Sequence, residues 1–550
     1  MSGNPAETMM SKTTPRATRL SSQAGSARGE ERFSFSKVLI ANRGEIALRV
    51  VRACRDLGLN SVAVYSDADR DAPHVRLADE AVRLGPAPAS ESYLRIDRIL
   101  DAARQTGAQA IHPGYGFLSE NPEFADACAQ AGITFVGPSA RVMREMGEKT
   151  AARRKAKEAN VPVTPGYDTG LDSAEQALEL AERIGYPVLL KAAAGGGGKG
   201  IRFVHQPADL TAALRLAQSE ALSAFGDASV YIEKAVAPAR HIEVQIFGDQ
   251  FGNVIHLGER ECSIQRRHQK LIEESPSPAL DEATRARLLD SAVRLAQSVG
   301  YTNAGTTEFL LGPDGQFYFL EVNARLQVEH PVTEWRTGLD LVREQLRVAA
   351  GLPLSVRQED VTFRGHAIEA RISAEDPFNK FLPAAGAVEA LHDPAGPGVR
   401  LDSGLYQGMR IPLFYDPLLA KLICWGEDRA EAIARLRRAL DEYVITGVRT
   451  TIPFAQWLMR QPRFLAGDFS TDYIAEEWRG ETPAALAASD GAASGDAALS
   501  AEQVAALAAA LVARDSASAH GERKRAAASD GHEEGWRWRL AGRKTASSGW

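Results

Sequence analysis

The stretch from residue 306 to 334 combines acidic, amide and cationic side chains at a spacing that could bind a metal ion. Its turn signal, Gly312-Pro313-Asp314-Gly315, is flanked by aromatic and branched residues, a pattern that predicts a β-hairpin. Alternation along the second strand places Glu321, Asn323 and Arg325 on one face. Oxygen ligands of this kind suit Mg²⁺ that bridges to phosphates.

A four-residue hairpin loop places Glu308 opposite Phe319, with Glu321 as its diagonal neighbour at about 7–8 Å. Phe317 and Phe319 then share the face of the carboxylates, which argues against the alternative of a fully exposed, salt-bridged strand. Glu329 follows the hairpin closely and is a candidate base.

The elements around this hairpin begin with short apolar runs that alternate with helical patterns. Such alternation predicts a parallel, doubly wound α/β sheet. The first strand-to-helix turn lacks GxGxxG, so a nicotinamide site is not supported. The loop His112–Phe117 is expected at the carboxyl edge of this sheet, where ligands bind. The expected strands cover residues 37–41, 61–65, 108–111 and 133–136.

A second candidate site follows the strand pattern that ends at Lys191. Four glycines, residues 195–198, precede Lys199 and form a loop whose N–H groups can approach phosphate oxygens. The P-loop pattern fails because Gly200 stands where Ser or Thr is required. The alternative is a flexible surface loop.

Further along the chain, residues 260–270 (RECSIQRRHQK) form a cationic stretch in a protein of net negative charge. This pattern predicts an anion site, although some of the charges could form internal ion pairs. Arg371 lies in an alternating strand pattern and could equally be a structural arginine. The glycine loop, the strand face with the carboxylates and the cationic stretch together indicate an ATP- and Mg²⁺-dependent enzyme that activates a small anion.

Composition agrees with an enzyme of several domains. The chain has 550 residues and a net charge of −7, which gives no reason to expect nucleic acid as a partner. No window approaches 18 consecutive apolar residues, so no membrane span is expected. Four scattered cysteines favour reduced thiols and a cytoplasmic location.

The two ends of the chain differ in composition from the rest. Residues 1–34 read as a disordered leader, with a transit peptide as the competing interpretation. Beyond residue 479 the chain becomes an Ala/Ser/Gly-rich linker and tail, with one helix expected where Ser500 and Gln503 form a capping box.

The chain from about residue 35 to 478 resembles the biotin carboxylase component of biotin-dependent carboxylases, an ATP-grasp family. The resemblance rests on IANRGEIALRV, HPGYGFLSEN, AAAGGGGKGIR, ERECSIQRRHQK, TTEF, LEVNARLQVEHPVTE and EARISAEDP in this order. It implies a Rossmann-like pre-ATP-grasp domain (35–148), an ATP-grasp domain (149–365) with a mobile lid at about 165–235, and a biotin carboxylase C-terminal domain (366–478).

The resemblance also implies the reaction. ATP and bicarbonate form carboxyphosphate, whose CO₂ passes to biotin on a separate carrier domain. The implied ATP contacts are Lys149, Lys191, Gly197, Gly198, Glu233, Lys234, Val236, His241, Gln265 and His268. The implied Mg²⁺ (or Mn²⁺) ligands are Glu308 and Glu321, with Asn323 beside them. Bicarbonate would contact Lys270, Arg325, Gln327 and Val328, with Glu329 as the base, and biotin would contact Arg371 and Tyr115.

The resemblance to acyl-CoA carboxylase α-subunits ends before a biotinyl domain, because no lysine is flanked by methionines. The residues 535–540 (GWRWRL) look like the start of such a subunit's linker domain, which favours a truncated chain. Implied partners are a biotin carboxyl carrier domain, a carboxyltransferase subunit and further copies of the chain. The alternatives are another ATP-grasp ligase and a non-catalytic scaffold subunit. The sequence does not indicate which acyl-CoA the complex would carboxylate.

Overall fold

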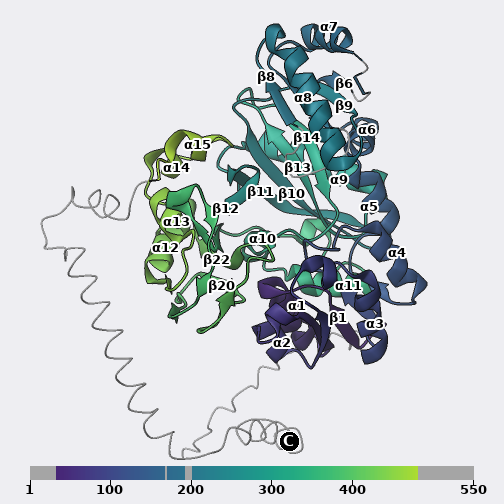
Figure 1. Cartoon of the computed structure of the whole chain (residues 1–550), viewed down its shortest axis with the longest axis vertical. Coiled ribbons are helices and arrows are strands. Elements are labelled where there is room, and N and C mark those ends of the chain that lie inside the picture. Colours follow the sequence, from purple (N-terminus) through teal and green to yellow (C-terminus); the bar gives the residue numbers. More distant parts are fainter. Residues whose placement is uncertain (1–32, 168–169, 172, 193–200, 481–550) are drawn as a thin grey trace, which may run out of the picture.

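The computed structural model describes residues 33–167, 170–171, 173–192 and 201–480 (Figure 1). The leader, the glycine run, the expected helix after Ser500 and the rest of the tail lie outside these ranges. None of the helices within them is both long enough and apolar enough to cross a membrane.

The N-terminal unit contains a five-stranded sheet of order β3-β2-β1-β4-β5 in which every pairing is parallel. The doubly wound sheet is therefore confirmed. One strand was missed: β3 is mostly exposed at the sheet edge, so its sequence EAVRLG lacks an apolar run. The strands are β1 (Lys37–Ile40), β2 (Asn60–Ser66), β3 (Glu80–Gly85), β4 (Ala110–His112) and β5 (Thr134–Phe135).

Alternation along β1 sends side chains into two separate cores, one on each face of the sheet. Val38 and Ile40 pack in one cluster with Val50, whereas Leu39 packs in the other with Ile99. Burial on both faces explains why β1 is apolar throughout. The helices of this unit are α1 (Gly44–Asp56), α2 (Pro73–Leu77), α3 (Ile96–Thr106), α4 (Pro122–Gln130) and α5 (Ala140–Gly147).

A four-stranded antiparallel sheet of order β6-β9-β7-β8 forms the upper part of the molecule in Figure 1. Two helices, α7 and α8, share its apolar core. The elements are β6 (Gly166–Tyr167), β7 (Val188–Ala192), β8 (Ile201–Val204), β9 (Val230–Lys234), α7 (Ala174–Ile184) and α8 (Pro207–Phe225), preceded by α6 (Lys149–Glu158).

An eight-stranded antiparallel sheet of order β14-β13-β10-β11-β12-β15-β22-β20 forms the centre of the molecule. It continues through the expected domain boundary at residue 365, because β12 pairs with β15. Its strands are β10 (Arg240–Gly248), β11 (Val254–Arg266), β12 (Gln269–Ser275), β13 (Asn303–Leu311), β14 (Phe317–Asn323), β15 (His366–Ser373), β20 (Val399–Ser403) and β22 (Leu418–Gly426).

Helices flank this sheet, and short two-stranded ladders complete its C-terminal part. The helices are α9 (Glu282–Ser298), α10 (His330–Thr337), α11 (Leu341–Ala349), α12 (Arg429–Glu442), α13 (Ile452–Leu458), α14 (Pro462–Leu465) and α15 (Tyr473–Glu477). The ladders pair β16 (Glu375–Asp376) with β17 (Leu382–Pro383), β18 (Gly386–Ala387) with β21 (Arg410–Ile411), and β19 (Leu391–His392) with β23 (Val444–Ile445).

The two faces of β15 and β22 differ in character. Ile368, Ala370 and Leu422 enter the apolar core that α12 completes. The alternate residues Arg371 and Lys421, which pair across the strands, form polar contacts with the segment leading into α10. Period-two alternation therefore turns one face of the sheet toward the candidate site and the other toward the core.

Candidate active site

The hairpin of β13 and β14 forms as predicted, but its register is different. Glu308 lies directly opposite Glu321, and Phe309 lies opposite Phe319, so Leu320 is an extra residue that forms a β-bulge. The expected pairing of Glu308 with Phe319 is wrong, because the expectation assumed regular alternation through the strand.

The bulge also corrects the expected faces of the strand. Phe317 and Phe319 pack with Phe309 in an apolar core, on the face opposite to Glu308 and Glu321. The extra residue shifts the alternation by one, which separates the aromatic residues from the carboxylates. The carboxylates thus come closer together than the sequence indicated.

Lys270 on β12 lies at the centre of the buried charges. Its Nζ contacts Glu243, lies 2.9 Å from Glu308 Oε1 and 2.7 Å from Glu329 Oε1. Burial lowers the pKa of Lys270, but the three carboxylates raise it and leave it well above its usual value. Lys270 therefore stays charged in this environment.

Glu329 is fully buried between two cations. One carboxylate oxygen accepts a hydrogen bond from Lys270, and the other accepts one from Arg371 Nη2 at 2.8 Å. Burial raises the pKa of Glu329, but Lys270 and Arg371 lower it well below its usual value. The resting carboxylate is thus ionised and, with both oxygens occupied, a weak base.

Arg371 bridges two glutamates. Its Nε donates to Glu273 Oε1 at 2.6 Å while its Nη2 reaches Glu329. Burial raises the pKa of Glu273 to about 7, although Arg371 lowers it. Arg371 is thus both ion-paired, as one interpretation of the sequence held, and adjacent to the expected base.

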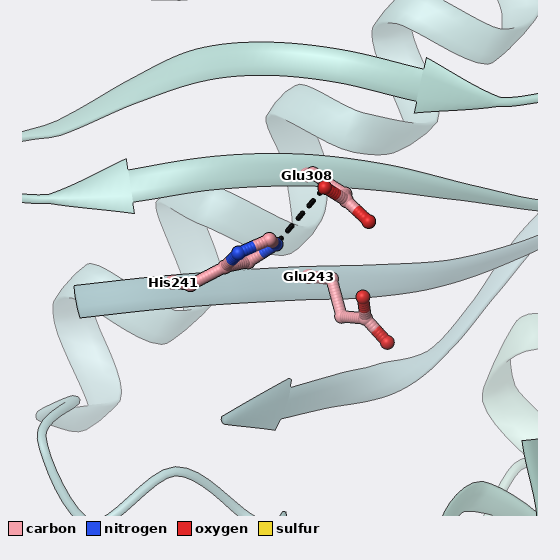
Figure 2. A group of neighbouring side chains, drawn as sticks. All are labelled: His241, Glu243 and Glu308. Carbon is pink, nitrogen blue, oxygen red and sulfur yellow. Dashed lines mark ion pairs between the residues drawn. The ribbon is translucent and has the colours of Figure 1, made fainter. Parts of the chain in front are cut away.

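Glu243 on β10 belongs to this cluster and was missed by the sequence analysis. Figure 2 shows His241 and Glu243 on one strand and Glu308 on its neighbour, with His241 Nε2 3.0 Å from Glu308 Oε2. Ligand atoms of these three residues lie within 4.8 Å of one another. The polar residues 241, 243 and 245 alternate with the apolar residues 242, 244 and 246, and this pattern is the signal that could have identified Glu243.

The residues expected to hold Mg²⁺ fit an oxygen-coordinated cation only in part. Glu308 and Glu321 are cross-strand partners, and burial together with the charge of Glu308 raises the pKa of Glu321. Two carboxylates facing each other favour a divalent cation between them. Asn323 Oδ1, however, accepts a hydrogen bond from Arg325 at 2.8 Å, and its Nδ2 donates to Glu308 at 2.9 Å.

His241 is a poorer ligand for this ion. Burial lowers the pKa of His241, but Glu308 raises it and the net shift is upward, which favours the imidazolium form. An imidazolium cannot coordinate a metal, and Mg²⁺ prefers oxygen ligands.

The segment after β14 holds the remaining residues of the expected anion site. Arg325 Nε lies 2.7 Å from Glu120 Oε2, a partner that the sequence analysis missed. Gln327 Nε2 donates to Glu308 Oε1 at 3.3 Å. The carbonyl of Val328 accepts a hydrogen bond from Lys421 Nζ at 2.9 Å. The structure thus brings Lys270, Arg325, Gln327, Val328 and Glu329 into one hydrogen-bonded region.

The residues expected at the triphosphate form a second group. Lys191 contacts Glu233, which also accepts a hydrogen bond from Thr164 at 3.0 Å. Burial lowers the pKa of Lys149, which Glu321 raises and Lys191 lowers. Partial desolvation and the nearby charges of His241, Lys191 and Lys149 lower the pKa of His268. Lys149 is therefore close enough to Lys191 and to Glu321 for their charges to change its pKa.

Other expected nucleotide contacts have different surroundings. Lys234 Nζ donates to the carbonyls of Gly185 and Tyr186, so its side chain is tied to the C-terminal end of α7. Gln265 Nε2 lies 3.5 Å from His241 Nδ1. Val236 is half-buried beyond the end of β9. Gly197 and Gly198 lie outside the described residues.

The basic stretch 260–270 is not a continuous anion site. Arg260 is fully buried and forms an ion pair with Glu243, with Nε–Oε1 at 2.5 Å. Arg266 pairs with Glu375 at 3.2 Å. Arg260 and Lys270 both contact Glu243 of the carboxylate cluster, whereas Arg266 does not pair with it, so the stretch is divided between two sets of ion pairs.

Tyr115 lies in the loop after β4, beside the end of β1. Asn42 Nδ2 donates to the carbonyls of Pro113 and Tyr115 at 2.7 and 2.8 Å. Gly114 has φ +64°, and a Cβ there would lie 2.9 Å from Asn42 Nδ2. The loop therefore lies at the point where the strand order reverses, as expected for a ligand-binding edge.

The fold and this site define an ATP-grasp ligase. The sequence model described as "Carbamoyl-phosphate synthase L chain, ATP binding domain" matches residues 148–357. Models described as "Biotin carboxylase, N-terminal domain" and "Biotin carboxylase C-terminal domain" match residues 34–143 and 369–476.

Known proteins resemble most of the chain. Biotin carboxylase 1 of Bacillus subtilis is 53% identical, over 80% of this chain and 98% of that protein. The propionyl-CoA carboxylase alpha chain of Ruegeria pomeroyi is 49% identical, over 81% of this chain and 68% of that protein. The crystal structure of the biotin carboxylase domain dimer of the Hydrogenobacter thermophilus 2-oxoglutarate carboxylase, in complex with MgADP, ADP and bicarbonate, has a TM-score of 0.77 at 47% identity. It covers 81% of this chain and 98% of that one.

The chain belongs to the biotin carboxylase family. Its activity is the ATP-dependent carboxylation of biotin, and the resemblance seen in the sequence is confirmed. Neither another kind of ATP-grasp ligase nor a non-catalytic scaffold is favoured.

Proposed function

We propose that the cluster around Lys270 forms carboxyphosphate from ATP and bicarbonate and passes its CO₂ to a carrier-bound biotin. The observation that carries this proposal is Glu329, a fully buried carboxylate whose two oxygens contact Lys270 and Arg371. A bound bicarbonate would draw Lys270 toward its own charge. Glu329 would then lose a cation, its pKa would rise, and it could accept the bicarbonate proton.

The phosphates would lie between Lys149 and Lys191 on one side and the carboxylate pair on the other. Mg²⁺ held by Glu308 and Glu321, with Asn323 nearby, would neutralise charge on the triphosphate. Further nucleotide contacts are proposed for Gly197, Gly198, Glu233, Lys234, Val236, His241, Gln265 and His268. Lys234 would contribute its main-chain groups, because its ammonium already binds two carbonyls. We also propose that the N-terminal domain covers residues 35–148, the ATP-grasp domain residues 149–365 and the C-terminal domain residues 366–478.

Bicarbonate would be held by Lys270, Arg325, Gln327 and the main chain of Val328. Arg371 would stabilise the charge that develops on the biotin ureido oxygen, with Tyr115 beside the ring. Arg371 already contacts Glu329, so proton removal and biotin activation would occur next to each other.

The acceptor would be biotin on a separate carrier domain, with a carboxyltransferase subunit as a further partner. The named relatives belong to carboxylases of different end substrates, so the choice of acyl-CoA or keto acid would reside in that other subunit. A homo-oligomer is supported by the dimer of the Hydrogenobacter relative. The four buried, unpaired cysteines support a cytoplasmic location.

ADP release with bicarbonate, measured with and without free biotin, tests this function. We expect release to depend on bicarbonate and to increase with biotin. The Glu329→Gln variant should lose about 10²–10⁴ in rate, since it cannot accept the proton. Wild-type rates in this variant would refute the role of Glu329, and ADP release that is independent of bicarbonate would refute the reaction.

A further inference from the structure

Lys421 on β22 is a completely buried lysine that lies beside the site and has no role in the residue assignments above. Its Nζ donates to the carbonyl of Val328 at 2.9 Å, and it lies 3.4 Å from Glu45 Oε2 and 4.0 Å from Asp402 Oδ2. Burying an ammonium group is costly unless it is paired. Asp402 and Glu45 supply the pairing, with Glu45 ionised above a pKa of about 7, and the third contact is with the carbonyl that precedes Glu329.

The partners of Lys421 come from different parts of the molecule. Glu45 lies on α1 of the N-terminal unit, Asp402 lies opposite Lys421 on β20, and Val328 precedes α10. Lys421 Nζ also lies 5.6 Å from the ring centroid of Tyr115, the residue proposed to flank biotin. One ammonium group thus contacts the loop of the base, the biotin side of the site and the first helix.

The main chain around Glu329 is held on its C-terminal side by the first turn of α10, where the Glu329 carbonyl accepts a hydrogen bond from Val332 N at 3.2 Å. Glu329 is the N-cap of α10, yet its side chain makes no capping hydrogen bond and points instead to Lys270 and Arg371. The orientation of the Val328–Glu329 peptide determines where the Glu329 side chain begins. A hydrogen bond to the Val328 carbonyl is therefore well placed to set the position of the base.

We propose that Lys421 is a positioning residue, which orients the Val328–Glu329 peptide so that the Glu329 carboxylate lies correctly against bicarbonate. Glu45 and Asp402 hold the Lys421 ammonium in place. The inference rests on the proposed role of Glu329 as the base. It differs from that role because Lys421 itself would touch neither substrate.

The Lys421→Met variant tests this inference, because methionine keeps much of the volume and removes the donor and the charge. We expect kcat/KM for bicarbonate to fall about 10–100-fold, as a misplaced reacting group does. The KM for ATP should stay within about twofold of wild type, since the proposed phosphate lysines Lys149 and Lys191 belong to a separate group of contacts.

The matched control is Arg429→Met, which removes a partly buried ion pair between α12 and β12. Arg429 Nε lies 2.6 Å from Glu274, and its other hydrogen bonds are to the carbonyls of Phe464 and Leu465, away from the loop before α10. Comparable losses in both variants, or an equal loss toward ATP and bicarbonate in Lys421→Met, would show a merely structural role and overturn the inference.

Glu45→Gln provides a second variant should Lys421→Met fail to fold. It keeps the shape of the side chain and removes the nearest carboxylate from Lys421. We expect a smaller fall in kcat/KM for bicarbonate, about 3–10-fold, with the KM for ATP unchanged. An unchanged kcat/KM for bicarbonate would overturn the inference. If instead Glu329→Gln were fully active, the proposed base would fail, whatever the result for Lys421.

Discussion

At the scale of single residues, the site is a balance of buried charges. Lys270 contacts three carboxylates, and Arg371 contacts two. In this structure both cations are paired with carboxylates of the protein. In the proposed mechanism each of them faces a substrate anion instead. Substrate binding would therefore exchange protein ion pairs for substrate ion pairs, and the cost of burying charge would already be met by the fold.

Replacing Arg371 should separate the biotin step from nucleotide binding. The Arg371→Ala variant should lose about 10²–10³ in the rate of biotin carboxylation, because no guanidinium stabilises the ureido oxygen. The affinity for ATP should be retained, which equilibrium binding can measure. The control Arg285→Ala, on α9, removes a mostly buried ion pair with Glu259 on β11. Wild-type carboxylation of free biotin by Arg371→Ala would contradict the assignment.

Replacing Glu321 should weaken metal binding. Glu321 faces Glu308 across the strands, so Glu321→Gln removes half of the proposed carboxylate pair. The Mg²⁺ concentration for half-maximal ATP turnover should rise by at least about 10-fold. Glu282→Gln, on a side chain that is 92% exposed, serves as the control. An unchanged Mg²⁺ dependence would place the metal elsewhere.

At the scale of elements, strands carry most of the side chains proposed to act in catalysis, and loops supply main-chain contacts. The bulge at Leu320 turns Glu321 toward Glu308 and leaves Phe319 in the core. In the N-terminal unit, Asn42 joins the ends of β1 and β4 through two hydrogen bonds. Each of these local features orients one proposed site residue. Removing one such feature should therefore affect the use of one substrate more than that of another.

Replacing Asn42 should affect stability and biotin together. Asn42→Ala leaves two carbonyls without their donor, which we expect to cost about 2–3 kcal/mol and to free the loop that carries Tyr115. The KM for free biotin should rise while the KM for ATP stays the same. The control Asn121→Ala removes only the N-cap of α4, so it should cost about 1 kcal/mol without changing the KM for biotin. Equal KM values for biotin in the two variants would contradict the link to Tyr115.

At the scale of the whole molecule, buried charges join the three parts of the chain. Glu334 on α10 binds Arg49 of α1 at 2.9 Å and Arg400 of β20 at 2.7 Å. Glu45 lies in the same region and faces Lys421 on β22 and Asp402 and Arg400 on β20. The junction of the three parts is therefore polar, and its stability depends on the protonation state of Glu45.

Glu45 should make the stability of the protein fall as the pH rises. Burial raises the pKa of Glu45 from 4.5 to about 7, while Lys421 lowers it, so the folded state keeps a proton that the unfolded state releases. The destabilisation, about 3 kcal/mol, begins above pH 4.5 and is complete above pH 7. The urea midpoint of Glu45→Gln, compared with that of wild type, should therefore increase steadily as the pH rises from 5 to 8. A constant difference across this range would contradict the shift.

The sequence alone determined the parallel sheet, the hairpin and its turn, and the family, because apolar periodicity, turn residues and ordered motifs are local properties of the chain. It also named Glu308, Glu321, Lys270, Glu329 and Arg371. Only the tertiary structure decided that Glu308 faces Glu321, since a one-residue bulge is invisible to an alternating pattern. It likewise placed Glu243, Glu120 and Lys421, because their partners lie on distant segments and a pairing between them leaves no local pattern.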